Sequence, residues 1–525
     1  MKPSTALAAA LLLAAGLASQ PAAANTLRWA AQNDIQTLDP HSQNHSATTT
    51  ITGYVYEGLT RYTETFDVEP ALAAKWTFVT PTQVRFELRR GVKFHDGTPF
   101  TADDVVFSFQ RIRHPASNMV IYASGVKEAK KIDDFTVDLL LDGPNPVLLR
   151  NLTFVRVVSK AWAQKNKVEN PQDFKAKEDT FAARNAMGTG PFKVVAWQPD
   201  QRLNMVANKD WWDKPKGNIS AVTYLPIKSD ATRVAALLSG DLDLLTDLPP
   251  QDVAKLKADP RLKVIEGPEN RTIFFALDLG SDEIKGASVK GRNPFKDRRV
   301  REAMSVAIDR EAIKRSLMRG LAIPAAVMVA PVAYGWSQEL DAAPKADIAR
   351  ARLLMADAGY ADGFEVPLAC PNDRYVNDEE ICQAVVSMWA RIGIKARLTT
   401  QPMTQHSAAL QRYELPLYLY GWGVTTFDAQ YTLQDIVHTK TGGADGKGNY
   451  SRVSDARVDA LVQQMKVETD APKRLALMQE ALKRTRDEYL FIPIHHQVRP
   501  WAMKAGVTIP HSANDAPQAK WATVK

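Results

Sequence analysis

Cysteine is scarce in this sequence: the chain of 525 residues contains two, Cys370 and Cys382. Neither belongs to a Cys-x-x-Cys pair, which argues against a redox-active dithiol and against a zinc site of the usual spacing. An even, isolated pair fits a disulfide formed in an oxidising compartment. Two free, buried thiols are the alternative that the sequence leaves open.

The motifs of common enzymes are also missing. The sequence has no Gly-x-Ser-x-Gly, no His-Glu-x-x-His and no Gly-x-Gly-x-x-Gly that opens a helix. Residues 441–448 resemble a phosphate loop, but Gly448 replaces the required Ser or Thr, so we interpret them as a flexible loop. His495 and His496 are adjacent on an expected strand and point to opposite faces, where they do not readily share one ion. We therefore expect no catalytic residue, no metal site and no cofactor.

Long runs of charge are absent as well. The 66 Lys and Arg residues exceed the 59 Asp and Glu residues by a net charge of +7. This mild excess is spread over a long chain and does not argue for a nucleic-acid partner. The length itself is too great for one hydrophobic core and predicts two or three lobes.

The long apolar run that the sequence does contain lies at its start. Lys2 precedes an apolar stretch over residues 5–17, and an Ala-x-Ala site follows at residues 22–24. This order is typical of a secretory signal peptide, and the run is shorter than the ~20 apolar residues that span a bilayer. We expect residues 1–24 to be removed as a signal peptide. Because no Cys follows the site, we expect an exported protein without a lipid anchor.

Helical and strand patterns alternate through most of the remaining chain. The expected strands lie at 26–30, 84–88, 394–398 and 491–496, and the expected helices at 300–308, 345–358 and 379–392. This alternation predicts an α/β protein with parallel sheets covered by helices.

Several single residues sharpen this prediction. Thr101 followed by Asp104 predicts a helix start close to a capping box. Ser454 and Asp470 are the expected N-caps of two late helices. Pro493 lacks a backbone donor and therefore disfavours a central, fully paired position in its strand.

One ordered set of motifs resembles a known family. Its longest stretch covers residues 85–108 and contains Gly-Val-Lys-Phe-His-Asp-Gly-Thr-Pro-Phe. Further matching stretches follow in the same order at residues 188–192, 208–212, 235–243, 293–303 and 307–310. Together they are similar to the landmarks of the family 5 bacterial extracellular solute-binding proteins, the peptide, dipeptide and nickel receptors of ABC importers.

The resemblance implies an α/β fold of the type II-like (class C) periplasmic binding protein class. Two ligand-enclosing lobes and one extra lobe are expected, with closure about a hinge. Lobe I would comprise residues 25–66, 192–270 and 492–525. Lobe II, the extra lobe, would comprise 67–191, and lobe III would comprise 271–491.

Residues 414–428 combine a strand pattern with a tryptophan between two glycines. Three leucines fall on one strand face and three aromatic residues on the other: Leu415, Leu417, Leu419 and Tyr418, Tyr420, Trp422. By itself this pattern fits a strand whose Trp is in the core. Gly421-Trp422, however, is similar to the Gly-Trp that lines the peptide pocket in relatives. The resemblance therefore makes Tyr420, Gly421, Trp422 and Gly423 candidate pocket residues.

The same alignment introduces a difference from the peptide receptors. Thr425 stands where those proteins carry an aspartate for the ligand's α-amino group, and a threonine supplies no charge. Asp428 lies three residues further and is the expected substitute. His41 is a further candidate by loose alignment. The loss of the aspartate favours a ligand whose amine is modified, absent or held elsewhere.

A second candidate segment is the loop over residues 370–378. The resemblance places Arg374, followed by Tyr375, where dipeptide-binding members pair an arginine with the ligand carboxylate. A guanidinium fork matches a carboxylate bidentately. The alternative is a surface arginine paired with Asp373 or Asp378. A Cys370–Cys382 bridge would hold this loop against the following helix.

The sequence thus predicts the periplasmic solute receptor of an ABC importer, with a small peptide-like, carboxylate-bearing ligand. The expected partner is an inner-membrane permease, and the receptor itself is expected to be a monomer. Alternatives are a non-peptide solute, such as an opine-like compound, a glutathione-like compound or a nickel complex. A secreted hydrolase is a more remote alternative.

Overall fold

The computed structural model describes residues 25–442 and 445–525. The predicted signal peptide therefore lies outside the described residues, as do two residues of the expected flexible loop. Within the described ranges, no helix has the length and apolar character needed to cross a membrane.

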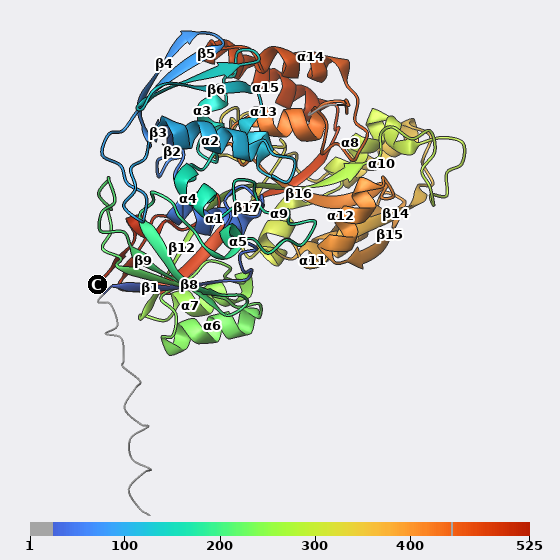
Figure 1. The fold of residues 1–525 in the computed structure, drawn as a ribbon. Helices are drawn as coiled ribbons and strands as arrows, with labels where there is room; N and C mark the ends of the chain where they lie inside the picture. Colours follow the sequence, from blue (N-terminus) through green and yellow to red (C-terminus); the bar gives the residue numbers. More distant parts are fainter. Residues whose placement is uncertain (1–24, 443–444) are drawn as a thin grey trace, which may run out of the picture.

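A large mixed sheet runs through the molecule (Figure 1). Its strands, in spatial order, are β15 (Ile394–Gln401), β14 (Phe364–Pro371), β16 (Leu417–Gly423), β12 (Leu262–Leu277), β17 (Ile492–Lys504), β11 (Leu244–Leu245), β1 (Thr26–Ala31), β10 (Ala221–Pro226), β9 (Arg202–Ala207) and β8 (Phe192–Gln198), with β13 (Ala322–Pro324) paired to β17. The expectation of parallel sheets holds only in part. β14 pairs parallel with β15 and β16, and β1 with β10 and β11, whereas β12 pairs antiparallel with β16 and β17.

A separate four-stranded antiparallel sheet is drawn in blue to teal in Figure 1, where β4, β5 and β6 are labelled. It contains β4 (Ala73–Thr80), β5 (Gln83–Leu88), β7 (Thr136–Leu141) and β6 (Val126–Asp133), in that order. Two small hairpins pair β2 (Thr60–Tyr62) with β3 (Val68–Pro70), and β18 (Val507–Thr508) with β19 (Thr523–Val524). The expected strand at 84–88 is thus the second strand of this sheet.

Helices cover the sheets. They are α1 (Ser46–Val55), α2 (Ala102–Ile112), α3 (Leu148–Asn151), α4 (Lys160–Lys165), α5 (Phe181–Arg184), α6 (Asp230–Ser239), α7 (Val253–Lys257), α8 (Arg298–Val306), α9 (Arg310–Ala312), α10 (Ile348–Asp357), α11 (Asp378–Ala390), α12 (Met403–Gln411), α13 (Ala429–Thr432), α14 (Ala456–Met465) and α15 (Ala471–Asp487). Two π-helical turns, Ile313–Leu317 and Leu433–Val437, continue α9 and α13. The sequence pattern did not predict either turn.

Helix starts follow the local chemistry of the sequence. The Thr101–Asp104 capping box at α2 is present in full. Asp470 caps α15, with Pro472 in the first turn, as expected. At α14 the prediction was one residue early: the N-cap is Asp455, whose carboxylate accepts from two backbone N–H groups, whereas Ser454 precedes the cap.

The prediction for Pro493 is confirmed: β13 pairs with His495–Gln497, and within the described residues the ladder partner of Pro493 lies in β12 alone. The proline is the second residue of β17, a strand with partners on both sides, and its own partner in β12 is Phe274. The ladder between β12 and β17 is irregular at this point, with a register shift between Ile273 and Phe274. A register shift of this kind accommodates a residue without a backbone donor, so the proline is compatible with an otherwise central strand.

Separate hydrophobic cores divide the chain, and we use the expected lobe ranges as names for its parts. The four-stranded sheet encloses its own core, around Phe86 and Phe100. The sheet around β1 packs a second core, with Trp29 and Trp501. Some apolar residues from the end of lobe II, including Trp162, join this second core rather than that of the four-stranded sheet. Two further cores lie on opposite sides of β12 and β16 in lobe III.

Candidate ligand-binding site

Strand β16 carries the glycine-flanked tryptophan. Leu417 and Leu419 enter one core of lobe III, and Tyr418 enters the other, as the alternation predicts. The strand continues through Gly423, and Trp422 pairs with Thr272 of β12. The two predicted faces are therefore confirmed for Leu417–Gly423, whereas Leu415 precedes the strand and packs against the core of the aromatic face. The loop begins only at Val424.

Tyr375 joins the two predicted segments. Its hydroxyl donates to the carbonyl oxygen of Gly421 at 3.2 Å. A Cβ atom on Gly421 would lie 2.6 Å from Cε1 of Tyr375 and 2.7 Å from Cδ1 of Ile273. Position 421 must therefore lack a side chain for the tyrosine ring to lie against the strand.

The loop that carries Arg374 is fixed at both ends. Cys370, at the end of β14, forms a disulfide with Cys382 of α11, so the disulfide prediction is confirmed. The carboxylate of Asp378 accepts from the backbone N–H groups of Arg374 and Tyr375 at 3.1 and 3.0 Å. Asp373 accepts from the N–H of Met403 at 2.7 Å. Both acidic neighbours of the arginine are thus engaged by backbone groups.

The guanidinium of Arg374 consequently has no carboxylate partner within the described residues, and the residue is partly covered by its neighbours while the rest of it stays open to solvent. It lies over the ring of Tyr375, 5.6 Å from the centroid. Arg271, on β12, lies near the same ring at 6.0 Å and pairs with Glu269 at 3.2 Å. The charge of Arg271, followed by burial, lowers the pKa of Arg374. Two guanidinium groups, those of Arg271 and Arg374, therefore lie close together. One carboxylate, that of Glu269, accompanies them, so the cluster keeps a net positive charge.

Residues of lobe I and lobe II face this cluster. His45, the N-cap of α1, lies close enough to Arg374 that its pKa is lowered by burial and then by that charge. Tyr122 of lobe II is within hydrogen-bonding reach of Thr425 and of Asn44, and burial raises its pKa to about 12. The predicted residues of lobe III thus face side chains from both other lobes.

Trp422 lines the same region. Its ring stacks on that of Tyr431, with 5.3 Å between centroids and an interplanar angle of 21°. Its Nε1–H is buried and has no acceptor within the described residues. Tyr431 also lies within hydrogen-bonding reach of Thr425. A buried, unsatisfied indole donor is costly unless a ligand or water accepts from it.

Two predicted residues lie outside this cluster. Asp428 is buried, and its carboxylate accepts from Nη1 and Nη2 of Arg474 at 2.7 and 2.9 Å. It also caps α13, so both of its roles here are structural. His41 is fully buried; its Nε2 lies 2.9 Å from the carbonyl oxygen of Arg156, and burial lowers its pKa to about 3.

Several residues of the cluster were missed by the sequence analysis: Glu269, Arg271, His45, Tyr122 and Tyr431. Arg271 lies within an irregularity in the pairing of β12 with β17, between Pro268 and Thr272. A register shift of this kind has no marker in the sequence. The others come from parts of the chain far from residues 370–428, and only the fold brings them there.

A hydroxyl–imidazole–carboxylate chain occurs elsewhere in lobe III. Nδ1 of His496 lies 2.8 Å from Oγ1 of Thr272, and its Nε2 lies 2.7 Å from Oδ2 of Asp341. Trp336 donates to the same carboxylate at 2.9 Å. Thr272 and His496 are fully buried. This arrangement resembles a hydrolytic triad in its hydrogen bonds, but it lies in the core, where it links β12, β17 and the segment before α10.

Three comparisons place the chain among known proteins. The model of a family described as bacterial extracellular solute-binding proteins, family 5 Middle, matches residues 67–444. Heme-binding protein A of Haemophilus influenzae is 27% identical over 460 residues, covering 82% of this chain and 79% of that protein. Glutathione-binding protein GsiB of Salmonella choleraesuis is 25% identical over 496 residues, covering 93% and 92%.

A solved structure gives the fold. The ABC transporter-associated periplasmic binding protein DppA from Helicobacter pylori, in complex with peptide STSA, matches with a TM-score of 0.78 at 22% identity, covering 95% of this chain and 98% of that one. The expected fold class, an α/β fold like that of the type II periplasmic binding proteins, is therefore confirmed. The relatives named above are binding proteins rather than enzymes.

Proposed function

This chain belongs to the family 5 bacterial extracellular solute-binding proteins, and from that premise we propose that it captures a peptide-like solute with a free carboxylate. It would serve as the receptor of an ABC importer and deliver the solute to an inner-membrane permease. We further propose that it works as a monomer in the periplasm, after removal of the signal peptide predicted for residues 1–24.

The observation that carries the ligand class is the unpaired guanidinium of Arg374. Its acidic neighbours are engaged by backbone groups, and the nearby Arg271 repels it. A ligand carboxylate at this position would form charge-assisted hydrogen bonds and relieve the repulsion between the two cations. The disulfide supports this role, because a loop that is already ordered loses less entropy on binding.

Recognition of the ligand's amine is proposed to differ from that of dipeptide receptors. Thr425 supplies no charge, and Asp428 is neutralised by Arg474 inside the protein. Neither position offers a free carboxylate to an ammonium group. We therefore propose a solute whose amine is modified, absent or held by another part of the cleft.

We assign the remaining candidates to the same wall of the proposed site. Tyr375, Tyr420, Trp422 and the backbone of Gly421 and Gly423 would contact the apolar part of the solute. The buried Nε1–H of Trp422 would donate to it. Closure of lobes I and II onto lobe III would then exclude water and strengthen these interactions, with no covalent step.

Other solutes form the second group of candidates. One relative is named for glutathione and another for heme, so the family accommodates ligands of different shape. A glutathione-like compound carries the carboxylates that a cluster of two arginines favours, and among the alternatives it fits the site best. An opine-like compound, a nickel complex and hydrolysis of a peptide are less supported by the residues that line the cleft.

The first experiment identifies the solute. The protein is purified without refolding, denatured, and the released small molecules are identified by mass spectrometry. We expect a compound with at least one carboxylate. Incubation of the native protein with a peptide pool should leave all peptide masses unchanged, and new cleavage products would instead support a hydrolase.

The second experiment tests Arg374 by calorimetry with the identified solute. Arg374→Ala should weaken binding about 10- to 100-fold, as expected for the loss of hydrogen bonds to a charged group. Arg374→Lys should give an intermediate loss, because an ammonium lacks the planar fork. Arg412→Ala is the matched control, since this exposed arginine pairs with Glu414. Unchanged affinity in Arg374→Ala would refute the proposed carboxylate site.

A further inference from the structure

A cavity lies between lobe II and lobe III. Its volume is about 710 Å³, which is within the range of small-molecule sites in proteins. Lobe II contributes the turn between β4 and β5 and the region around α3, and lobe III contributes residues near α13 and α15. None of Arg374, Tyr375 or Trp422 lines this cavity.

The charge of the cavity is set by one residue. Asp428 and Arg474 both line it, but each neutralises the other through two hydrogen bonds. Arg150 also lines it and has no carboxylate partner within the described residues; its Nη1 donates long bonds, of 3.3 and 3.4 Å, to the carbonyl oxygens of Phe66 and Thr426, and its guanidinium lies within hydrogen-bonding reach of Tyr62. The cavity therefore carries one unneutralised positive charge.

The rest of the lining is largely apolar. Phe78 and Val79, adjacent residues near the end of β4, are 52% and 50% exposed. Pro81, Pro146 and Leu149 complete an apolar wall beside them. A single exposed apolar side chain needs no explanation, but a cluster of them around a cavity indicates a binding surface.

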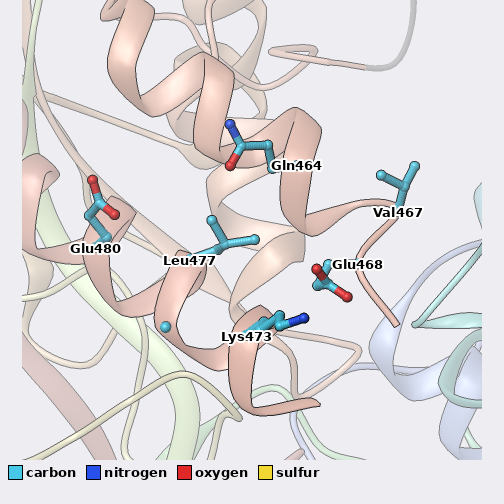
Figure 2. Close-up of a pocket in the computed structure, with 7 residues that line it drawn as sticks. Gln464, Val467, Glu468, Lys473, Leu477 and Glu480 are labelled. Atoms are coloured by element: carbon cyan, nitrogen blue, oxygen red, sulfur yellow. The ribbon is translucent and has the colours of Figure 1, made fainter. Parts of the chain in front are cut away.

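The groove between α14 and α15 serves as a contrast (Figure 2). Its volume is about 520 Å³, and all of its lining residues belong to lobe III. Val467 at its edge is 52% exposed, but charged side chains of both signs, Glu468, Lys473 and Glu480, surround the hollow. Three of the seven lining residues of this groove are charged, and lobe II contributes none of the seven.

We propose that the cavity between lobes II and III binds an amphipathic organic acid, with its carboxylate on Arg150 and its apolar body against Phe78, Val79 and Leu149. Because the walls come from two lobes, the complete cavity exists only when these lobes are together. A ligand that fills it stabilises the closed form, and by linkage it also tightens binding of the transported solute. The cavity is thus a regulatory site, separate from the cleft.

Octanoate is the probe, and octanol is the uncharged control of the same length. Calorimetry on the full protein should show saturable binding of octanoate, at least tenfold tighter than that of octanol. Val79→Trp, which fills the mouth of the cavity, should abolish octanoate binding. Val467→Trp places the same side chain at the control groove and should leave it unchanged. Melting temperatures identify any variant that fails to fold.

Arg150→Gln separates charge from shape. It should weaken octanoate at least tenfold and leave octanol unaltered. Arg374→Ala should bind octanoate like the unmodified protein, so failure of the solute-binding proposal does not affect this one. Small-angle scattering should show that octanoate shifts the protein to a smaller radius of gyration. Absence of octanoate binding, or binding that Val79→Trp leaves intact, would overturn the proposal.

Discussion

The rings of Phe66 and Phe427 stack on one another, with 3.9 Å between centroids and an interplanar angle of 24°. Both residues have left-handed backbones, with φ of 63° and 53°, which costs a non-glycine residue ~1–3 kcal/mol. Tyr62 adds an edge contact to Phe427 and donates from its hydroxyl to the carbonyl oxygen of Thr426 at 3.2 Å. Two strained turns of lobes I and III therefore meet at a contact that exists only while these lobes are together.

Removal of this contact should favour the open form. Phe66→Ala eliminates one ring of the stack, and such pairs contribute ~0.5–1.5 kcal/mol beyond the area they bury. We expect solute affinity to fall about two- to tenfold and the radius of gyration of the solute-bound protein to rise, measured by calorimetry and small-angle scattering. Phe174→Ala, which removes an exposed ring of lobe II, is the control and should change neither. Equal affinities for the two variants would contradict this role.

Gly421 is predicted to tolerate no side chain. In Gly421→Ala the new methyl group would lie 2.6 Å from Cε1 of Tyr375, and relief of such an overlap costs ~1–3 kcal/mol. Because Tyr375 lies beside Arg374, we expect both the free energy of unfolding and solute affinity to fall. Gly143→Ala is the control, since no atom lies within 4 Å of the position of its Cβ. Urea denaturation and calorimetry measure the two effects.

The disulfide should stabilise the loop that carries Arg374. Reduction, or the double variant Cys370→Ser with Cys382→Ser, should lower the free energy of unfolding by about 3 kcal/mol, the value for a short closed loop. Solute affinity should fall as well, because the loop must then be ordered on binding. Since the chain has only these two cysteines, a reductant acts on this bond alone. Two freely reactive thiols in denatured, oxidised protein would contradict the bond.

Local features were predictable wherever the deciding chemistry lies within a few residues. The capping box at Thr101 and the cap at Asp470 are examples, because each cap depends on side chains and backbone groups of one turn. The alternating faces of β16 follow from strand geometry in the same way. The choice between Ser454 and Asp455 was not predictable, since both are good caps and Arg484, a residue of α15, pairs with the latter.

The site was predictable only in part, because its decisive interactions are long-range. Asp428 was expected to supply the negative charge that Thr425 cannot supply. Its carboxylate is instead bound by Arg474, a residue of α15. The sequence likewise could not decide whether Asp373 or Asp378 pairs with Arg374, since the answer depends on backbone N–H groups that the folded loop turns toward them. Arg271 reaches the cluster through a register shift.

The carboxyl group of Asp435 should make stability depend on pH. Burial raises its pKa from 3.8 to about 6, against a smaller lowering by the N–H of Gly448. Between about pH 4 and pH 6 the folded protein therefore binds more protons than the unfolded chain, so the contribution of this group to stability is lost as pH rises through that window.

Asp435→Asn removes the cost of ionisation and should raise the free energy of unfolding at pH 7.5 by ~1–3 kcal/mol, with little change at pH 4. Asp455→Asn is the opposite control: burial raises the pKa of Asp455, but the hydrogen bonds and charge of Arg484 and the N–H groups of Val458 and Arg457 together lower it below the usual value, so that variant should lose stability at pH 7.5. Urea denaturation at the two pH values measures both, and a loss in Asp435→Asn at pH 7.5 would show that its carboxylate is stabilised rather than penalised by the fold.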